Sequence, residues 1–152
     1  MQRRQSLPVA WLITDARIGA PLESLARRLP RGSGLILRDG AELTPRLRLI
    51  ARRRSLALVD ERQRGAARVH DPREIRRERL AGRRLLLLSP LFETRSHPDW
   101  RPLPRMRAAA LTRLAGRPLL ALGGMDARRF RSVRKLGFDG WAAIDAWLRL
   151  RT

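Results

Sequence analysis

The sequence predicts an α/β fold with a parallel β-sheet. Short apolar runs alternate with amphipathic segments along the 152 residues, and several runs are apolar on both faces, as strands of a covered parallel sheet are. Each run has 4–6 residues, which is too short for a buried helix. Seven strands favour a barrel or a doubly wound sheet, and they are expected at Val9–Thr14, Gly34–Arg38, Leu56–Val59, Ala67–His70, Leu85–Ser89, Pro118–Leu122 and Gly140–Ile144.

Helices are expected between the strands, because the intervening segments carry helix start and stop signals. Thr44 and Asp71 each precede a proline, which suits the first helical position, and Glu74 completes a capping-box pattern. Gly116 and Gly137 suit the left-handed residue that ends a helix. The expected helices are Pro21–Leu29, Pro45 to about Arg53, a segment from Pro72 onward, Leu103–Leu114, and a segment capped by Asp126 that ends at Leu136.

One interval is too short for this alternation. Seven residues separate Val59 from Ala67, whereas a parallel crossover takes about a dozen or more. Either one of the two runs is not a sheet strand, or a βα unit is absent. We predict a gap or a non-helical connection beside Asp60, whose exposed strand edges a loop or a partner subunit of a homo-oligomer would cover. The chain has no linker or low-complexity block, so one domain is expected over residues 1–152.

Composition excludes several kinds of site. The chain has no cysteine, and His70 and His97 are its only histidines, so a metal would be held mainly by carboxylate oxygens, as magnesium usually is. The apolar runs are far shorter than the roughly 20 residues of a membrane helix, and Val9–Ile13 is too short for a signal-peptide core. We expect a soluble cytoplasmic protein.

The net charge of +20 predicts attraction to polyanions. Among the 34 basic residues, Lys135 is the only lysine. This charge suits phosphorylated small molecules as well as nucleic acid. There is no zinc-finger spacing, aromatic-rich strand pair or separate basic tail, so nucleic acid is expected to bind without specificity.

Polar residues follow the predicted strands, where active sites of parallel α/β folds form. After Ser89, the chain offers Thr94, Arg95, Ser96 and His97, which can surround a phosphate with donors, although an ordinary surface loop would read the same way. Gly123-Gly124 lies between a strand and a helix start, where backbone N–H groups can approach an anion; glycines also serve tight turns.

Four segments resemble the thiamine-phosphate synthase and TenI family: LSPLFETRSHP (88–98), PLLALGGMDARRFRSVRKLGFDGWAAIDAW (118–147) and, less closely, WLITD (11–15) and GLILRD (34–39). The resemblance implies a TIM-type (β/α) barrel, here incomplete, with about seven strands and one βα unit missing or shortened. It also implies a transferase that couples hydroxymethylpyrimidine diphosphate with thiazole phosphate, giving thiamine phosphate and pyrophosphate with Mg²⁺.

The resemblance assigns candidate catalytic and metal residues. At the second strand the family has Gln-x-Arg-x-Lys, of which Arg38 remains as a substrate-binding and catalytic residue. The family's Asn-Asp after the third strand becomes Val59-Asp60, which keeps the expected magnesium carboxylate. A second acidic ligand is expected on the unit that is missing here, so we expect weak magnesium binding and low synthase activity.

The family's phosphate-binding positions are partly kept. Its pyrophosphate loop Thr-x-Thr-Lys becomes Thr94-Arg95-Ser96-His97, which keeps both hydroxyls and loses the lysine. The glycine that binds thiazole phosphate corresponds to Gly124, next to Gly123. The family's Ile/Val-Ser near the C-terminus becomes Ile144-Asp145, where a carboxylate would repel a phosphate.

Two alternatives to a synthase remain. The TenI branch aromatises the thiazole as a tautomerase, and its catalytic histidine follows a valine, as His70 follows Val69 here. An imidazole with a pKa of about 6.5 can take and return a proton, although a strand-end histidine is often structural. The other alternative is a non-catalytic binder of thiamine precursors with a degenerate site. A synthase should need both Arg38 and Asp60, and a tautomerase neither.

Overall fold

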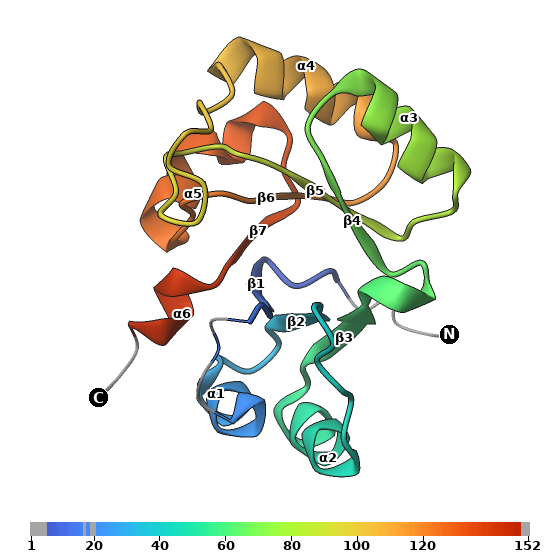
Figure 1. Ribbon diagram of the computed structural model, residues 1–152, viewed down its shortest axis with the longest axis vertical. Coiled ribbons are helices and arrows are strands. Elements are labelled where there is room, and N and C mark those ends of the chain that lie inside the picture. Colours follow the sequence, from blue (N-terminus) through green and yellow to red (C-terminus); the bar gives the residue numbers. More distant parts are fainter. Residues whose placement is uncertain (1–5, 17, 19–20, 150–152) are drawn as a thin grey trace.

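The strands form a nearly closed barrel (Figure 1). The computed structural model describes residues 6–16, 18 and 21–149, and within these ranges seven parallel strands form one sheet with the order β3-β2-β1-β7-β6-β5-β4. All the predicted strands are therefore confirmed, and β5, β6 and β7 are neighbours as their helical crossovers require. The strands are β1 (Ala10–Ile13), β2 (Gly34–Leu37), β3 (Ala57–Asp60), β4 (Ala66–Val69), β5 (Leu85–Leu88), β6 (Leu119–Ala121) and β7 (Gly140–Ala143).

The helices lie on the outside of the barrel (Figure 1). The predicted caps form: the Oγ1 of Thr44 accepts from the backbone N–H of Leu47 at 3.0 Å, and the Oδ1 of Asp71 accepts from that of Glu74 at 2.9 Å. One predicted helix is shorter than expected, since it ends at Val133 and a 3₁₀ turn continues to Leu136. The helices are α1 (Leu22–Arg28), α2 (Pro45–Arg54), α3 (Pro72–Leu80), α4 (Arg105–Ala115), α5 (Ala127–Val133) and α6 (Asp145–Leu148), with 3₁₀ turns η1 (Glu61–Gln63) and η2 (Arg134–Leu136).

The barrel is open between β3 and β4, which are the two edges of the sheet. The short interval holds only the 3₁₀ turn η1, so the prediction that a βα unit is missing is confirmed (Figure 1). The turn is tight: the N–H of Gly65 donates to the carbonyl of Asp60 at 3.2 Å, and a Cβ on Gly65 would lie 2.2 Å from that oxygen. Glycine at this position lets the chain re-enter the sheet after a single turn.

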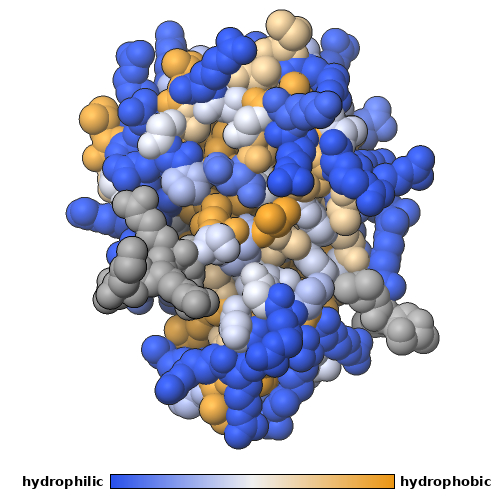
Figure 2. Space-filling model, turned by 180° about the vertical axis from the view of Figure 1, so that it is seen from behind, coloured by the Kyte–Doolittle hydropathy of each residue, from blue (hydrophilic) through white to orange (hydrophobic). Residues whose placement is uncertain are grey.

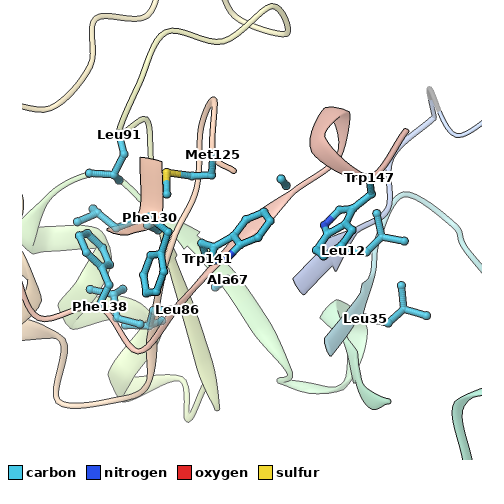
Figure 3. Packing of buried hydrophobic residues seen from close by; sticks show 14 of the residues in the cluster. Leu12, Leu35, Ala67, Leu86, Leu91, Met125, Phe130, Phe138, Trp141 and Trp147 are labelled. Carbon is cyan, nitrogen blue, oxygen red and sulfur yellow. The ribbon is translucent and has the colours of Figure 1, made fainter. Parts of the chain in front are cut away.

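Alternate residues on each strand belong to two different cores, which explains why the strands are apolar on both faces. One core fills the barrel and the other packs the sheet against the helices. Trp11 in the barrel interior covers Gly34, where a Cβ would lie 1.9 Å from the indole ring. The outer core includes Trp147 of α6, which lies beside Leu12 (Figure 3). The Nε1–H of Trp147 also donates to the carbonyl of Trp11 at 2.9 Å, which fixes this unpredicted helix.

The surface reflects the arginine-rich composition. Figure 2 shows hydrophilic side chains covering both ends of one face, with less hydrophilic residues gathered between them. No helix in the described part of the chain is long and apolar enough to cross a membrane.

Candidate functional site

A cavity of about 440 Å³ opens at the carboxyl ends of the strands. Its walls come from the ends of six strands and from the loop between β5 and α4. The alternation of side chains along a strand determines which residues face the cavity. A residue two positions after one that packs in the barrel interior points to the same side, and so toward the cavity. The cavity-lining residues placed in this way are Arg38, Arg68, Ser89 and Ile144.

Arg38 is held at the end of β2 by its neighbours. Its backbone N–H donates to the Oγ1 of Thr14 at 2.7 Å, and its Nε donates to the Oε2 of Glu61 at 3.0 Å. The carboxylate of Asp39 lies 3.8 Å from its Nη2. Its Nη1 is buried and has no hydrogen-bond partner. The arginine that the sequence singled out therefore lines the cavity with an unused donor.

Arg68 also lines the cavity, and sequence reasoning missed it. It lies on β4, one of the two edge strands at the open seam. Its Nε is buried without a hydrogen-bond partner. Burial lowers the pKa of the guanidinium, and the charge of Arg38 lowers it further, against smaller opposing effects of nearby carboxylates. One feature of the sequence could have pointed to Arg68. It is a charged residue inside an otherwise apolar strand, two positions after Ala66, which packs in the barrel interior.

The loop after β5 brings three of its predicted residues to the cavity. Thr94, Ser96 and His97 all line it, whereas Arg95 is exposed and is not among the lining residues. The backbone N–H of His97 donates to the Oγ1 of Thr94 at 3.1 Å, which closes a tight turn. The hydroxyl of Thr94 keeps its own proton for donation to a ligand.

Trp100 contacts both histidines and was not predicted as a site residue. Its ring stacks on His97 with centroids 4.2 Å apart, and it meets the ring of His70 edge-on at 5.3 Å. The Nδ1 of His70 lies 2.8 Å from the Oε2 of Glu74, while its Nε2 is buried and has no partner. His70 is not among the cavity-lining residues, but Trp100 is, and Trp100 therefore lies between His70 and the cavity.

Gly123 and Gly124 line the cavity and also allow two loops to pack closely. Both have positive φ, 97° and 59°. A Cβ on Gly123 would lie 2.8 Å from the Cα of Pro90, and one on Gly124 would lie 2.4 Å from the carbonyl oxygen of Glu93. The glycines therefore set the position of the loop that carries Thr94 and Ser96.

The expected magnesium ligand faces elsewhere. The Oδ1 of Asp60 accepts from the backbone N–H of Arg62 at 2.9 Å and caps η1, and Asp60 is not among the cavity-lining residues. The carboxylates that do line the cavity are Asp15, Asp39 and Asp145, and Asp15 and Asp145 are engaged in interactions within the chain. Among the described residues no three histidine, aspartate or glutamate side chains gather as a metal site. Asp60 therefore does not fit the magnesium role that the resemblance implies.

Comparisons with known proteins show a family and a similar fold. The family described as thiamine monophosphate synthase (TMP-TENI) matches residues 51–147. A thiamine phosphate pyrophosphorylase from Pyrococcus furiosus is similar in structure, with a TM-score of 0.73 and 20% identity over 93% of this chain and 88% of that chain. A FabK mutant from Thermotoga maritima has a TM-score of 0.47 and 15% identity, over 93% of this chain and 44% of its own. No curated protein matches the sequence. The likeness to the pyrophosphorylase is one of fold.

Proposed function

Because the chain belongs to the thiamine monophosphate synthase and TenI family, we propose that it couples hydroxymethylpyrimidine diphosphate with thiazole phosphate to give thiamine phosphate and pyrophosphate. The observation that supports this most directly is the gathering of Arg38, Thr94, Ser96 and Gly124 around one cavity at the carboxyl ends of the strands. These residues come from three separate segments that the family resemblance selected independently.

The chemistry needs stabilisation of a leaving diphosphate. When the bond between the pyrimidine's methylene carbon and the diphosphate oxygen breaks, both electrons leave with the oxygen, and a pyrimidine cation forms. Negative charge therefore grows on the diphosphate, and donors fixed around it lower the barrier. The Nη1 of Arg38 and the hydroxyls of Thr94 and Ser96 are the donors assigned to this work.

The remaining walls suit a flat heterocycle. Ile13, Leu122 and Met125 form apolar wall, and the exposed ring of Trp100 stands at the mouth. Thiazole phosphate is assigned to the side of Gly124 and Ile144. Asp145 lines the same side, and its carboxylate repels a phosphate. We therefore expect weak binding of thiazole phosphate and slow coupling.

Thiazole tautomerisation is the second candidate, and the pair of His70 and Glu74 favours it. A carboxylate 2.8 Å from Nδ1 fixes the ring and leaves Nε2 as the nitrogen for proton transfer. A substrate would have to displace Trp100 to reach Nε2, because the indole ring packs against His70. A non-catalytic binder of the precursors is the remaining alternative.

The test incubates the purified protein with both precursors, with and without Mg²⁺, and follows thiamine phosphate by chromatography. We expect time-dependent product that Arg38→Met abolishes. Arg76 is exposed on α3, so Arg76→Met is a control with the same change of charge and should retain activity. Absence of product from the wild-type protein would overturn the synthase proposal. If the protein forms no thiamine phosphate but aromatises the thiazole phosphate tautomer, and His70→Gln loses this activity, the protein is a tautomerase instead.

A further inference from the structure

Two guanidinium groups with unused donors face the same cavity. Arg38 and Arg68 both line it, and the Nη1 of one and the Nε of the other are buried without hydrogen-bond partners. The open seam lies between them, since Arg38 ends β2, which neighbours the edge strand β3, and Arg68 lies on the other edge strand, β4. The two side chains are close enough for the charge of Arg38 to disfavour the protonated form of Arg68.

This arrangement costs stability unless an anion is bound. Two partly buried cations repel each other, and each loses part of its hydration without a full set of partners. The carboxylate of Glu61 offsets the charge of Arg38, since its Oε2 lies 3.0 Å from the Nε of Arg38. No carboxylate among the described residues lies within ion-pair distance of Arg68, although the more distant charges of Glu61, Asp39 and Asp15 favour its protonated form. A pair of guanidinium groups inside a ligand-sized cavity is a site for a multiply charged oxyanion such as a diphosphate.

We propose that Arg68 is a substrate-binding residue which, together with Arg38, holds the diphosphate group of the substrate. The identity of that substrate rests on the proposed function, but the clamp itself is defined by the two arginines. Arg68 lies outside every motif that carries the family resemblance, and it supplies positive charge on the side of the cavity where the chain has lost a βα unit.

Two of the three carboxylates that line the cavity lie on the side opposite the seam, whereas the third, Asp39, lies 3.8 Å from the Nη2 of Arg38. Asp15 follows β1 and Asp145 follows β7, and these central strands lie opposite the seam in the barrel. The diphosphate is therefore directed to the seam, beside the two arginines. The organic part of the substrate is directed to the apolar wall around Ile13 and Leu122.

Titration calorimetry with inorganic pyrophosphate, in buffer containing EDTA, tests the clamp directly. The wild-type protein should bind with a stoichiometry near one, and Arg68→Met should weaken binding by about tenfold or more, equivalent to about 1.4 kcal/mol. Arg68→Lys keeps the charge and loses the fork geometry, so its affinity should fall between the two. Arg76→Met should bind like the wild-type protein. Thermal unfolding of each variant verifies folding.

Three outcomes would overturn the clamp. They are unchanged affinity in Arg68→Met, equal weakening in Arg76→Met, and binding by the wild-type protein only when Mg²⁺ is added. The binding readout does not depend on turnover. A protein that binds pyrophosphate through Arg68 but forms no thiamine phosphate would refute the proposed reaction and leave the clamp standing.

Discussion

The carboxylate of Glu61 accepts a hydrogen bond from the Nε of Arg38 at 3.0 Å, which links the 3₁₀ turn η1 to the end of β2. Arg83 holds the same turn from the other side, since its Nη1 donates to the carbonyl of Glu61 at 3.0 Å and its Nε donates to the Oε2 of Glu78 at 2.9 Å. The connection that replaces a βα unit therefore positions an arginine of the cavity, as well as joining two strands.

Removing the charge of Glu61 should expose the repulsion between the two arginines. Glu61→Gln leaves Arg38 without its closest carboxylate, and we expect the free energy of unfolding to fall by about 1 kcal/mol, a modest value because Glu61 is partly exposed. In Arg38→Met the same change of Glu61 should cost almost nothing. Urea unfolding of both single variants and the double variant measures this coupling, and additive effects would show that the pair contributes no stability.

Arg68→Met should stabilise the ligand-free protein. The substitution removes a partly buried cation that lies near Arg38 and has an unsatisfied Nε, and it keeps an unbranched side chain. We expect a gain of about 1 kcal/mol or less in the free energy of unfolding, measured in urea without phosphate, because solvent screens a partly exposed charge. Added pyrophosphate should raise the melting temperature of the wild-type protein, and at the same concentration it should raise that of Arg68→Met by less. A less stable variant would indicate that Arg68 supports the fold rather than the ligand.

Acid sensitivity should depend on Glu78. Burial opposes its ionisation, but hydrogen bonds from Arg83 and Arg77 outweigh this and lower the pKa of its carboxyl below the ordinary value of 4.5. A carboxyl with a lowered pKa stabilises the fold above its unfolded pKa and loses that contribution as the pH falls through the folded pKa. Glu78→Gln should therefore be less stable than the wild-type protein at pH 7, and the difference should shrink below about pH 4.5.

Melting temperatures between pH 3 and pH 8 measure this difference. Glu42 is exposed, and Glu42→Gln provides the matched control with little change at any pH. Asp71, whose pKa the backbone N–H of Glu74 lowers, titrates in the same direction in all three proteins and so cancels in the comparison. A difference between wild type and Glu78→Gln that stays constant down to pH 3 would contradict the assignment.

Magnesium should bind weakly, and Asp60 should not be responsible for what binding there is. Its carboxylate caps η1 through the N–H of Arg62, and no three-ligand group exists among the described residues. Calorimetric titration of the ligand-free protein with MgCl₂ should give little heat, and Asp60→Asn should give the same trace. A tight site that disappears in Asp60→Asn would restore the metal role that the family resemblance implied.

Local signals predicted the elements well, whereas which predicted site residues line the cavity depends on long-range placement. The cap formed by Asp71 and the backbone of Glu74 involves residues three apart, so the sequence alone predicts it. The direction of a strand-end side chain depends instead on register. Asp60 shares the side of Leu58, which packs in the outer core, whereas Arg68 shares the side of Ala66 in the barrel interior. Without the register, the sequence could not show that Arg68 lines the cavity and that Asp60 does not. Trp100 is twelve residues beyond the end of β5, and only the folded loop brings it to the cavity.

The last prediction concerns the close packing between Gly124 and the loop that follows β5. A Cβ on Gly124 would lie 2.4 Å from the carbonyl oxygen of Glu93, and its φ of +59° strains any other residue. Gly124→Ala should therefore push the loop bearing Thr94 and Ser96 away from the cavity, destabilise the fold by about 1–3 kcal/mol and weaken pyrophosphate binding. Gly32 is the matched control, since its φ is +77° but a Cβ there meets nothing within 4 Å.

Gly32→Ala should show only the conformational cost of its backbone, about 1 kcal/mol, with pyrophosphate affinity unchanged. Urea unfolding and calorimetry on the two variants separate strain in the backbone from displacement of the loop. If both variants lose equal stability and both bind pyrophosphate like the wild-type protein, then contact between the glycine and the loop does not position Thr94 and Ser96. A loss of affinity confined to Gly124→Ala would show that this packing aligns the donors on which the proposed chemistry depends.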